Sequence, residues 1–89
     1  MYVHAGNNRM IRKRDIIGIF DMDTATMEPS TREYLKLAEK EGRMVNIKEE
    51  IPKSFIVALH EKDRDTVYVS QISTSALLGR IQAGMGEQK

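Results

Sequence analysis

The sequence contains no cysteine and no tryptophan, and only two prolines, among its 89 residues. The absence of cysteine excludes a disulfide-stapled scaffold, a thiolate metal site and a cysteine nucleophile. The longest apolar run spans residues 16–20, whereas a membrane-spanning helix needs ~20 apolar residues. The first residues also lack the apolar stretch of a signal peptide. We therefore expect a cytoplasmic protein without a membrane partner.

What the sequence does have is an uneven distribution of charge. It holds 14 Lys and Arg against 13 Asp and Glu, which gives a formal net charge of +1. All charged residues within 1–14 are basic, and all charged residues within 15–28 are acidic. A basic turn between two strands could contact phosphate groups. Two solvated surface strips would explain the same pattern, so both interpretations stay open at this point.

The apolar pattern predicts several short strands. We expect them at residues 1–5, 10–11, 16–20, 43–47, 54–60 and 66–70, with turns at residues 6–8 and 61–65. Residues 16–20 show no polar alternation, which is typical of a central strand that is buried on both faces. Residues 21–28 are polar and are expected to form a loop.

Two helices complete the expected set. Ser30 and Glu33 match the capping-box spacing and Gly42 suits a left-handed C-cap, which together predict a helix over residues 31–41. A last helix should follow Ser73 or Ser75 and end at the glycines 84 and 86.

The order of these elements predicts an α+β fold. The expected domain is a small, mainly antiparallel sheet with one central helix and a C-terminal helix. We expect residues 1–82 to form a single domain and residues 83–89 to form a flexible C-terminal tail.

Candidate chemistry is sparse. Asp21 and Asp23 follow an apolar strand, which resembles the nucleophile loop of haloacid-dehalogenase-type phosphatases. A chain of 89 residues cannot build the doubly wound parallel sheet of that fold, and no later Asp pair with a loop pattern completes its Mg²⁺ site. His4 and His60 are the only histidines, too few for a zinc site without cysteine. We therefore expect no enzymatic activity, metal, cofactor or small-molecule substrate.

Four segments spread over about residues 1–82 carry a family resemblance. They read MYVH at 1–4, RDIIGIFD at 14–21, PKS at 52–54 and ISTSAL at 72–77. They resemble the RemA/RemB family of bacterial extracellular-matrix (biofilm) regulatory proteins, and the RemB branch most closely. The resemblance implies a DNA-binding protein that activates transcription of matrix genes. It also implies a LytTR-like β-rich fold and self-association into a homo-oligomer, which could be a ring.

The resemblance also bears on the binding residues. By position, the basic residue before the 16–20 strand is Arg14. The RemA-like branch has an arginine pair before the next β-run, where only Lys53 supplies charge in this sequence. The leading hypothesis is that basic turns, repeated in a homo-oligomer, contact DNA phosphates through Arg9, Arg12, Lys13, Arg14, Lys53 and Arg80. The alternative is a structural or protein-interaction module that self-assembles without strong DNA binding.

Overall fold

The computed structural model describes residues 2–6, 9–47, 51–59 and 64–87, and side chains up to residue 82. In chain order the elements are β1 (Tyr2–Gly6), β2 (Arg9–Arg12), the 3₁₀ turn η1 (Lys13–Asp15), β3 (Ile16–Asp21), α1 (Met22–Ala25), α2 (Pro29–Lys40), β4 (Met44–Asn46), β5 (Ser54–Leu59), β6 (Asp65–Ser70) and α3 (Thr74–Glu87). The predicted turns at residues 6–8 and 61–65 lie mostly outside the described residues.

Two sheets form the framework. One has the order β3-β5-β6-β4, and its pairs are antiparallel except for the parallel pair of β4 and β6. The other is the antiparallel hairpin of β1 and β2. The predicted α+β class, the mainly antiparallel pairing and the C-terminal helix are confirmed, whereas the LytTR-like likeness stays a prediction.

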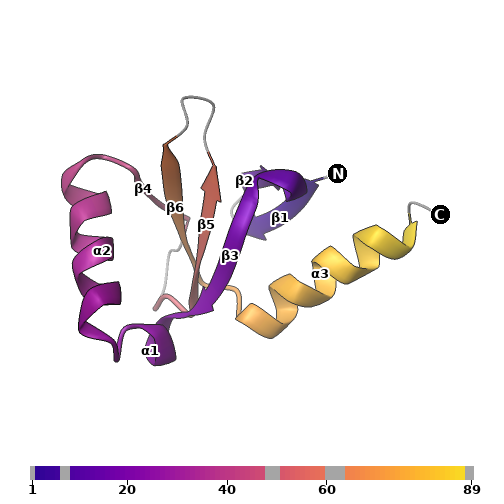
Figure 1. Ribbon diagram of the computed structural model, residues 1–89. Coiled ribbons are helices and arrows are strands. Elements are labelled where there is room, and N and C mark those ends of the chain that lie inside the picture. The colour runs from indigo at the N-terminus through magenta and orange to yellow at the C-terminus, as the bar shows by residue number, and fades with distance from the viewer. Residues whose placement is uncertain (1, 7–8, 48–50, 60–63, 88–89) are drawn as a thin grey trace.

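The four-stranded sheet separates two cores. Helix α2 lies on one side of the sheet, and the hairpin and α3 lie on the other (Figure 1). Alternate side chains of a strand point to opposite faces. Phe55 and Val57 of β5 therefore pack toward α2, together with the buried Ala38 of that helix. Ile56 of β5 points the other way and packs beneath the hairpin and α3, where Leu77 is also buried.

Strand β5 is a central strand with a neighbour on each side, and the prediction that residues 16–20 form such a strand is wrong. Every residue of β5 from Ser54 to Ala58 is buried. In contrast, β3 lies at the edge of the sheet and pairs with β5 alone among the described strands. Its Ile17 is 64% exposed and its Phe20 is 42% exposed. An apolar run predicts a strand, but strand order decides how much of it is buried.

Helix α2 begins two residues earlier than predicted. Pro29 stands in its first turn, where a missing N–H costs nothing because that N–H would have no helical partner. Glu28 therefore occupies the N-cap position, and its side chain makes no capping bond. The predicted capping box of Ser30 and Glu33 is wrong for this reason. After the helix, Gly42 adopts a φ of 74°, as its left-handed role predicts.

A short helix, α1, replaces part of the predicted polar loop. The Asp21 carboxylate caps it by accepting the Thr24 N–H at 2.9 Å, and this bond lowers the pKa of Asp21. The Met22 N–H donates to the Lys53 carbonyl at 2.9 Å and ties α1 to the start of β5. Asp21 thus has a structural task as the cap of α1.

Helix α3 begins where the sequence predicts and extends further. Ser73 Oγ accepts the Ala76 N–H at 3.2 Å, so Ser73 is the cap. The helix then continues to Glu87, and the prediction that Gly84 ends it is wrong. A glycine weakens a helix but does not by itself stop it. The division into a domain of residues 1–82 and a tail stays a prediction.

A buried serine, Ser70, joins the hairpin to the sheet. Ser54 and Ser70 pair across β5 and β6, and both are fully buried. Ser70 Oγ donates to the Ala5 carbonyl at 2.8 Å and accepts the Ile72 N–H at 3.0 Å. Ala5 lies at the register shift between β1 and β2, and no residue of β2 stands opposite it. Ser70 therefore fastens the hairpin to β6 by a buried hydrogen bond.

Candidate nucleic-acid interface

Four of the predicted phosphate ligands lie on β2 and the turn after it. Arg9 and Arg12 are the first and last residues of β2, and Lys13 and Arg14 belong to η1. Ile11 is buried between the hairpin and the sheet, which fixes β2 against the body of the protein. The three arginines are exposed and Lys13 is half-buried. The hairpin thus holds a basic segment at the surface.

Carboxylates neutralise little of this segment. Arg12 Nε lies 3.8 Å from Asp15 Oδ2 in an exposed pair, a kind of contact that contributes little stability. Within the part of the chain that the structure describes, Arg9, Lys13 and Arg14 form no ion pair. An unpaired guanidinium offers a planar set of N–H donors that matches the oxygens of a phosphate group.

Lys53 lies apart from the basic turn. Asp21, the last residue of β3, pairs with Ser54, so Lys53 lies beside the end of β3 that is remote from η1. At ~3.4 Å per residue, the length of β3 separates the two by roughly 17 Å. The Lys53 side chain is exposed, and its backbone N–H donates to the Ser70 carbonyl at 2.9 Å. Lys53 and the basic turn therefore form two separate cationic points on one chain.

Arg80 makes a contact inside the molecule. Its Nη1 donates to the His4 carbonyl at 2.6 Å and lies 3.3 Å from His4 Nδ1. This contact fastens α3 to β1. Arg80 is exposed, so its remaining N–H groups stay accessible to solvent.

Two further arginines line the same hollow as Arg9, and the sequence does not predict this proximity. A hollow of about 370 Å³ is lined by Arg9 from β2, Arg43 just before β4 and Arg64 just before β6. The three positions are far apart in the chain, and charges of both signs surround Arg43 and Arg64 in the sequence. Only the packing of the hairpin beside β6 and β4 brings them together.

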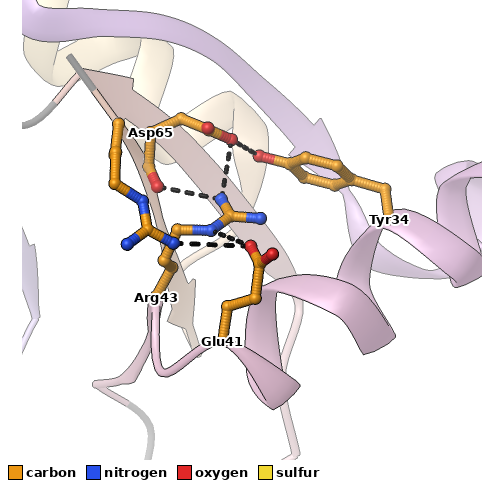
Figure 2. A network of polar contacts seen from close by, with 5 residues as sticks. Tyr34, Glu41, Arg43 and Asp65 are labelled. Carbon is orange, nitrogen blue, oxygen red and sulfur yellow. Dashed lines mark hydrogen bonds and ion pairs between the residues drawn. The ribbon is translucent and has the colours of Figure 1, made fainter.

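Arg43 is held in this hollow by carboxylates (Figure 2). Its Nε donates to Glu41 Oε1 at 2.7 Å, and its Nη1 lies 3.1 Å from Asp65 Oδ2 and 3.0 Å from the Asp65 carbonyl. The guanidinium carbon lies 5.9 Å from the centre of the Tyr34 ring, and the Tyr34 hydroxyl donates to Asp65 Oδ2. The network joins the end of α2 to the start of β6.

These contacts shift the pKa values of the partners. The hydrogen bond from Tyr34 lowers the pKa of Asp65, and burial raises the pKa of Tyr34. The bond to Glu41 raises the pKa of Arg43. Arg43 is thus charged and engaged at neutral pH. Arg64 is more available to a ligand than Arg43. Its Nη2 lies 3.5 Å from Glu41 Oε1, a longer contact than the 2.7 Å of Arg43, and its side chain is 59% exposed.

The described residues provide neither a metal-binding cluster nor a membrane-spanning helix. No group of three or more metal-ligating side chains lies together within the described ranges. His60, one of the two histidines, lies outside them. None of the helices in those ranges is long and apolar enough to cross a membrane.

The fold and this surface define a class: a small α+β domain that displays exposed arginines on a β-hairpin and on the turn after it. No family model matches the chain. Its sequence is 35% identical over 82 residues to Extracellular matrix regulatory protein B of Bacillus subtilis (strain 168), which covers 92% of this chain and 91% of that protein. The chain therefore belongs to the family of Extracellular matrix regulatory protein B, and the RemB-like resemblance of its sequence is confirmed.

Proposed function

We propose that this protein regulates extracellular-matrix genes by binding DNA in the cytoplasm, without enzymatic activity. The relative from Bacillus subtilis is named as a regulatory protein of the extracellular matrix. The observation that carries DNA binding is the exposed basic segment of β2 and η1. Its Arg9, Lys13 and Arg14 form no ion pair among the described residues.

Phosphate contacts would dominate such binding. Each cation that neutralises a phosphate releases a condensed counterion, so affinity falls steeply with salt. One chain offers a short row of cations on the hairpin, with Lys53 roughly 17 Å away at ~3.4 Å per strand residue. A homo-oligomer repeats the row and lengthens it. Arg12 and Arg80 contribute through the donors that Asp15 and His4 leave open, and Arg64 joins Arg9 at the edge of the hollow.

The test is DNA affinity as a function of salt. The variant Arg12→Gln/Lys13→Gln/Arg14→Gln should lower the slope of log K against log[salt] by about 2.7, since each phosphate contact contributes about 0.9. The matched control is Lys36→Gln/Lys40→Gln, because both lysines are exposed on α2, on the other face of the sheet. Wild type that binds no DNA at about 50 mM salt, where backbone contacts are strong, contradicts the proposal.

A second candidate function is a protein-interaction module that self-assembles without strong DNA binding. The observation that favours it is an open apolar groove of about 510 Å³ beside β3, which includes the exposed Ile17 and Phe20. Light scattering with and without a DNA duplex separates the two candidates. An oligomer whose mass ignores DNA favours the module, and a DNA-induced increase in mass favours the regulator.

A further inference from the structure

We propose that the outer edge of β3 pairs in antiparallel fashion with the same edge of a second copy, across a two-fold axis. The two four-stranded sheets would then join into one. This inference rests on the self-association that both candidate functions include, and it does not depend on DNA binding.

The first observation is the open edge itself. Among the described strands, β3 pairs only with β5, so the backbone groups on its other side have no strand partner. The segment from Gly18 to Asp21 pairs regularly with β5, and the register shift lies before it. A regular, apolar edge strand is a template for another strand, and proteins that stay monomeric protect such edges with charge or proline. Here Ile19 and Phe20 occupy the middle of the edge.

The second observation is an uncovered apolar surface along that edge. Helix α2 packs over β6 and β4 and leaves the β3 side of the same face open (Figure 1). The apolar lining of the groove there consists of the exposed Ile17, Phe20 and Leu59 and the buried Phe55 and Val57. Antiparallel pairing would bring Ile17 and Phe20 of the two copies together and remove this surface from water.

The third observation, charge complementarity, selects a second copy as the occupant. Lys13 and Arg14 stand at the start of β3, and Asp21 and Asp23 stand at its end. When two such strands run antiparallel, the basic end of each lies beside the acidic end of the other. A two-fold axis repeats this match at both ends of the pair. Parallel pairing would set like charges side by side, which disfavours it.

This arrangement gives the two charge blocks of the sequence one physical purpose. The basic block precedes β3 and the acidic block follows it, with the apolar strand between them. The charges lie at the rim of the pair, where they stay in contact with water. The basic turn can therefore meet a phosphate oxygen as well as the partner's carboxylates.

The main test changes the apolar surface without changing the core. Ile17→Lys alters a side chain that is 64% exposed, so the monomer should fold as before. The control is Ile51→Lys, which places the same lysine at an isoleucine that is 83% exposed and lies outside the groove. Sedimentation of the full chain should show an even-numbered assembly for wild type and Ile51→Lys, and a smaller mass for Ile17→Lys with an unchanged circular dichroism spectrum. An Ile17→Lys protein of wild-type mass, or an odd number of subunits in wild type, overturns the inference.

A charge swap tests the orientation. Arg14→Glu and Asp23→Arg should each weaken self-association by about tenfold, because each replaces an attraction at the rim by a repulsion. Combined in one chain they should restore it, since the two ends then match again with opposite sign. Additive weakening in the double variant contradicts antiparallel pairing. DNA binding plays no part in either readout, so a protein that pairs in this way and ignores DNA would disprove only the DNA-binding function.

Discussion

The two faces of the sheet differ in how completely they are covered. On one face the hairpin and α3 enclose Ile56, Ala58 and Leu77, each with at most 2% exposure. On the other face α2 lies over β6 and β4, and Ile17 and Phe20 of β3 remain exposed beside it. Apolar residues on the first face hold the monomer together. Those at the edge of the second face contribute little to the monomer and are free to bind a partner.

The largest expected loss of stability comes from a substitution in the core of the covered face. Ile56→Ala should lower the free energy of unfolding by about 3 kcal/mol, because it leaves a cavity among residues that cannot collapse into it. Ile17→Ala on the open face should cost less than about 0.5 kcal/mol in the monomer. Urea unfolding of both variants at a concentration that keeps the protein monomeric measures the difference. Equal losses would show that the open face is part of the monomer core.

The next effect tests the bond that fastens the hairpin over the covered face. Ser70→Ala should cost about 2 kcal/mol, because the buried Ala5 carbonyl then loses the hydroxyl that donates to it at 2.8 Å. The control is Ser30→Ala in the first turn of α2, which should change stability by less than about 0.5 kcal/mol because Ser30 does not cap that helix. A large loss in the control would restore the capping box that the sequence predicts.

The strand positions of both faces can be predicted from the sequence, but the burial of one strand cannot. The positions of the strands follow from runs such as Val67-Tyr68-Val69, and Gly42 marks the end of α2 by its left-handed backbone. The burial of residues 16–20 does not follow, because it depends on β5 lying between β3 and β6. The sequence also predicts Arg9 as a binding residue, but it does not predict Arg43 and Arg64. These three arginines come from separate segments that only the fold places side by side.

A smaller effect on stability is expected from the polar network of Tyr34, Asp65 and Arg43, which lies between the covered and open halves of the α2 face. Tyr34→Phe removes the hydrogen bond to Asp65 and should cost about 1 kcal/mol at neutral pH. Because the folded-state pKa of Asp65 is lowered, its contribution is present above the unfolded pKa of about 3.9 and is lost as the pH falls through the folded value. Tyr34→Phe should therefore reduce the loss of stability between about pH 5 and pH 2.

Urea unfolding across this range checks the pH effect. Tyr68→Phe on the hairpin face is the control, because Tyr68 packs against the other core and does not contact Asp65 through a hydrogen bond. Tyr68→Phe should follow the wild-type pH profile. An unchanged profile in Tyr34→Phe would show that the Tyr34 hydroxyl does not set the pKa of Asp65.

The smallest effect in the monomer comes from the floor of the open groove. The Phe20 ring stacks on Phe55 with their centres 5.1 Å apart, and it lies across Gly18. A Cβ at Gly18 would stand 2.8 Å from two Phe20 ring carbons, so Gly18→Ala should push the ring off Phe55. The net cost should stay below about 1 kcal/mol, because alanine also restricts the unfolded chain.

Nuclear Overhauser contacts between the rings of Phe20 and Phe55 measure this displacement. They should weaken in Gly18→Ala, while contacts between Ile56 and Leu77 on the covered face stay as in wild type. Self-association should weaken as well, because Phe20 would no longer lie flat along the edge where a second β3 is expected to pair. Loss of the ring contacts without any change in self-association would separate the packing of this face from its use as an interface.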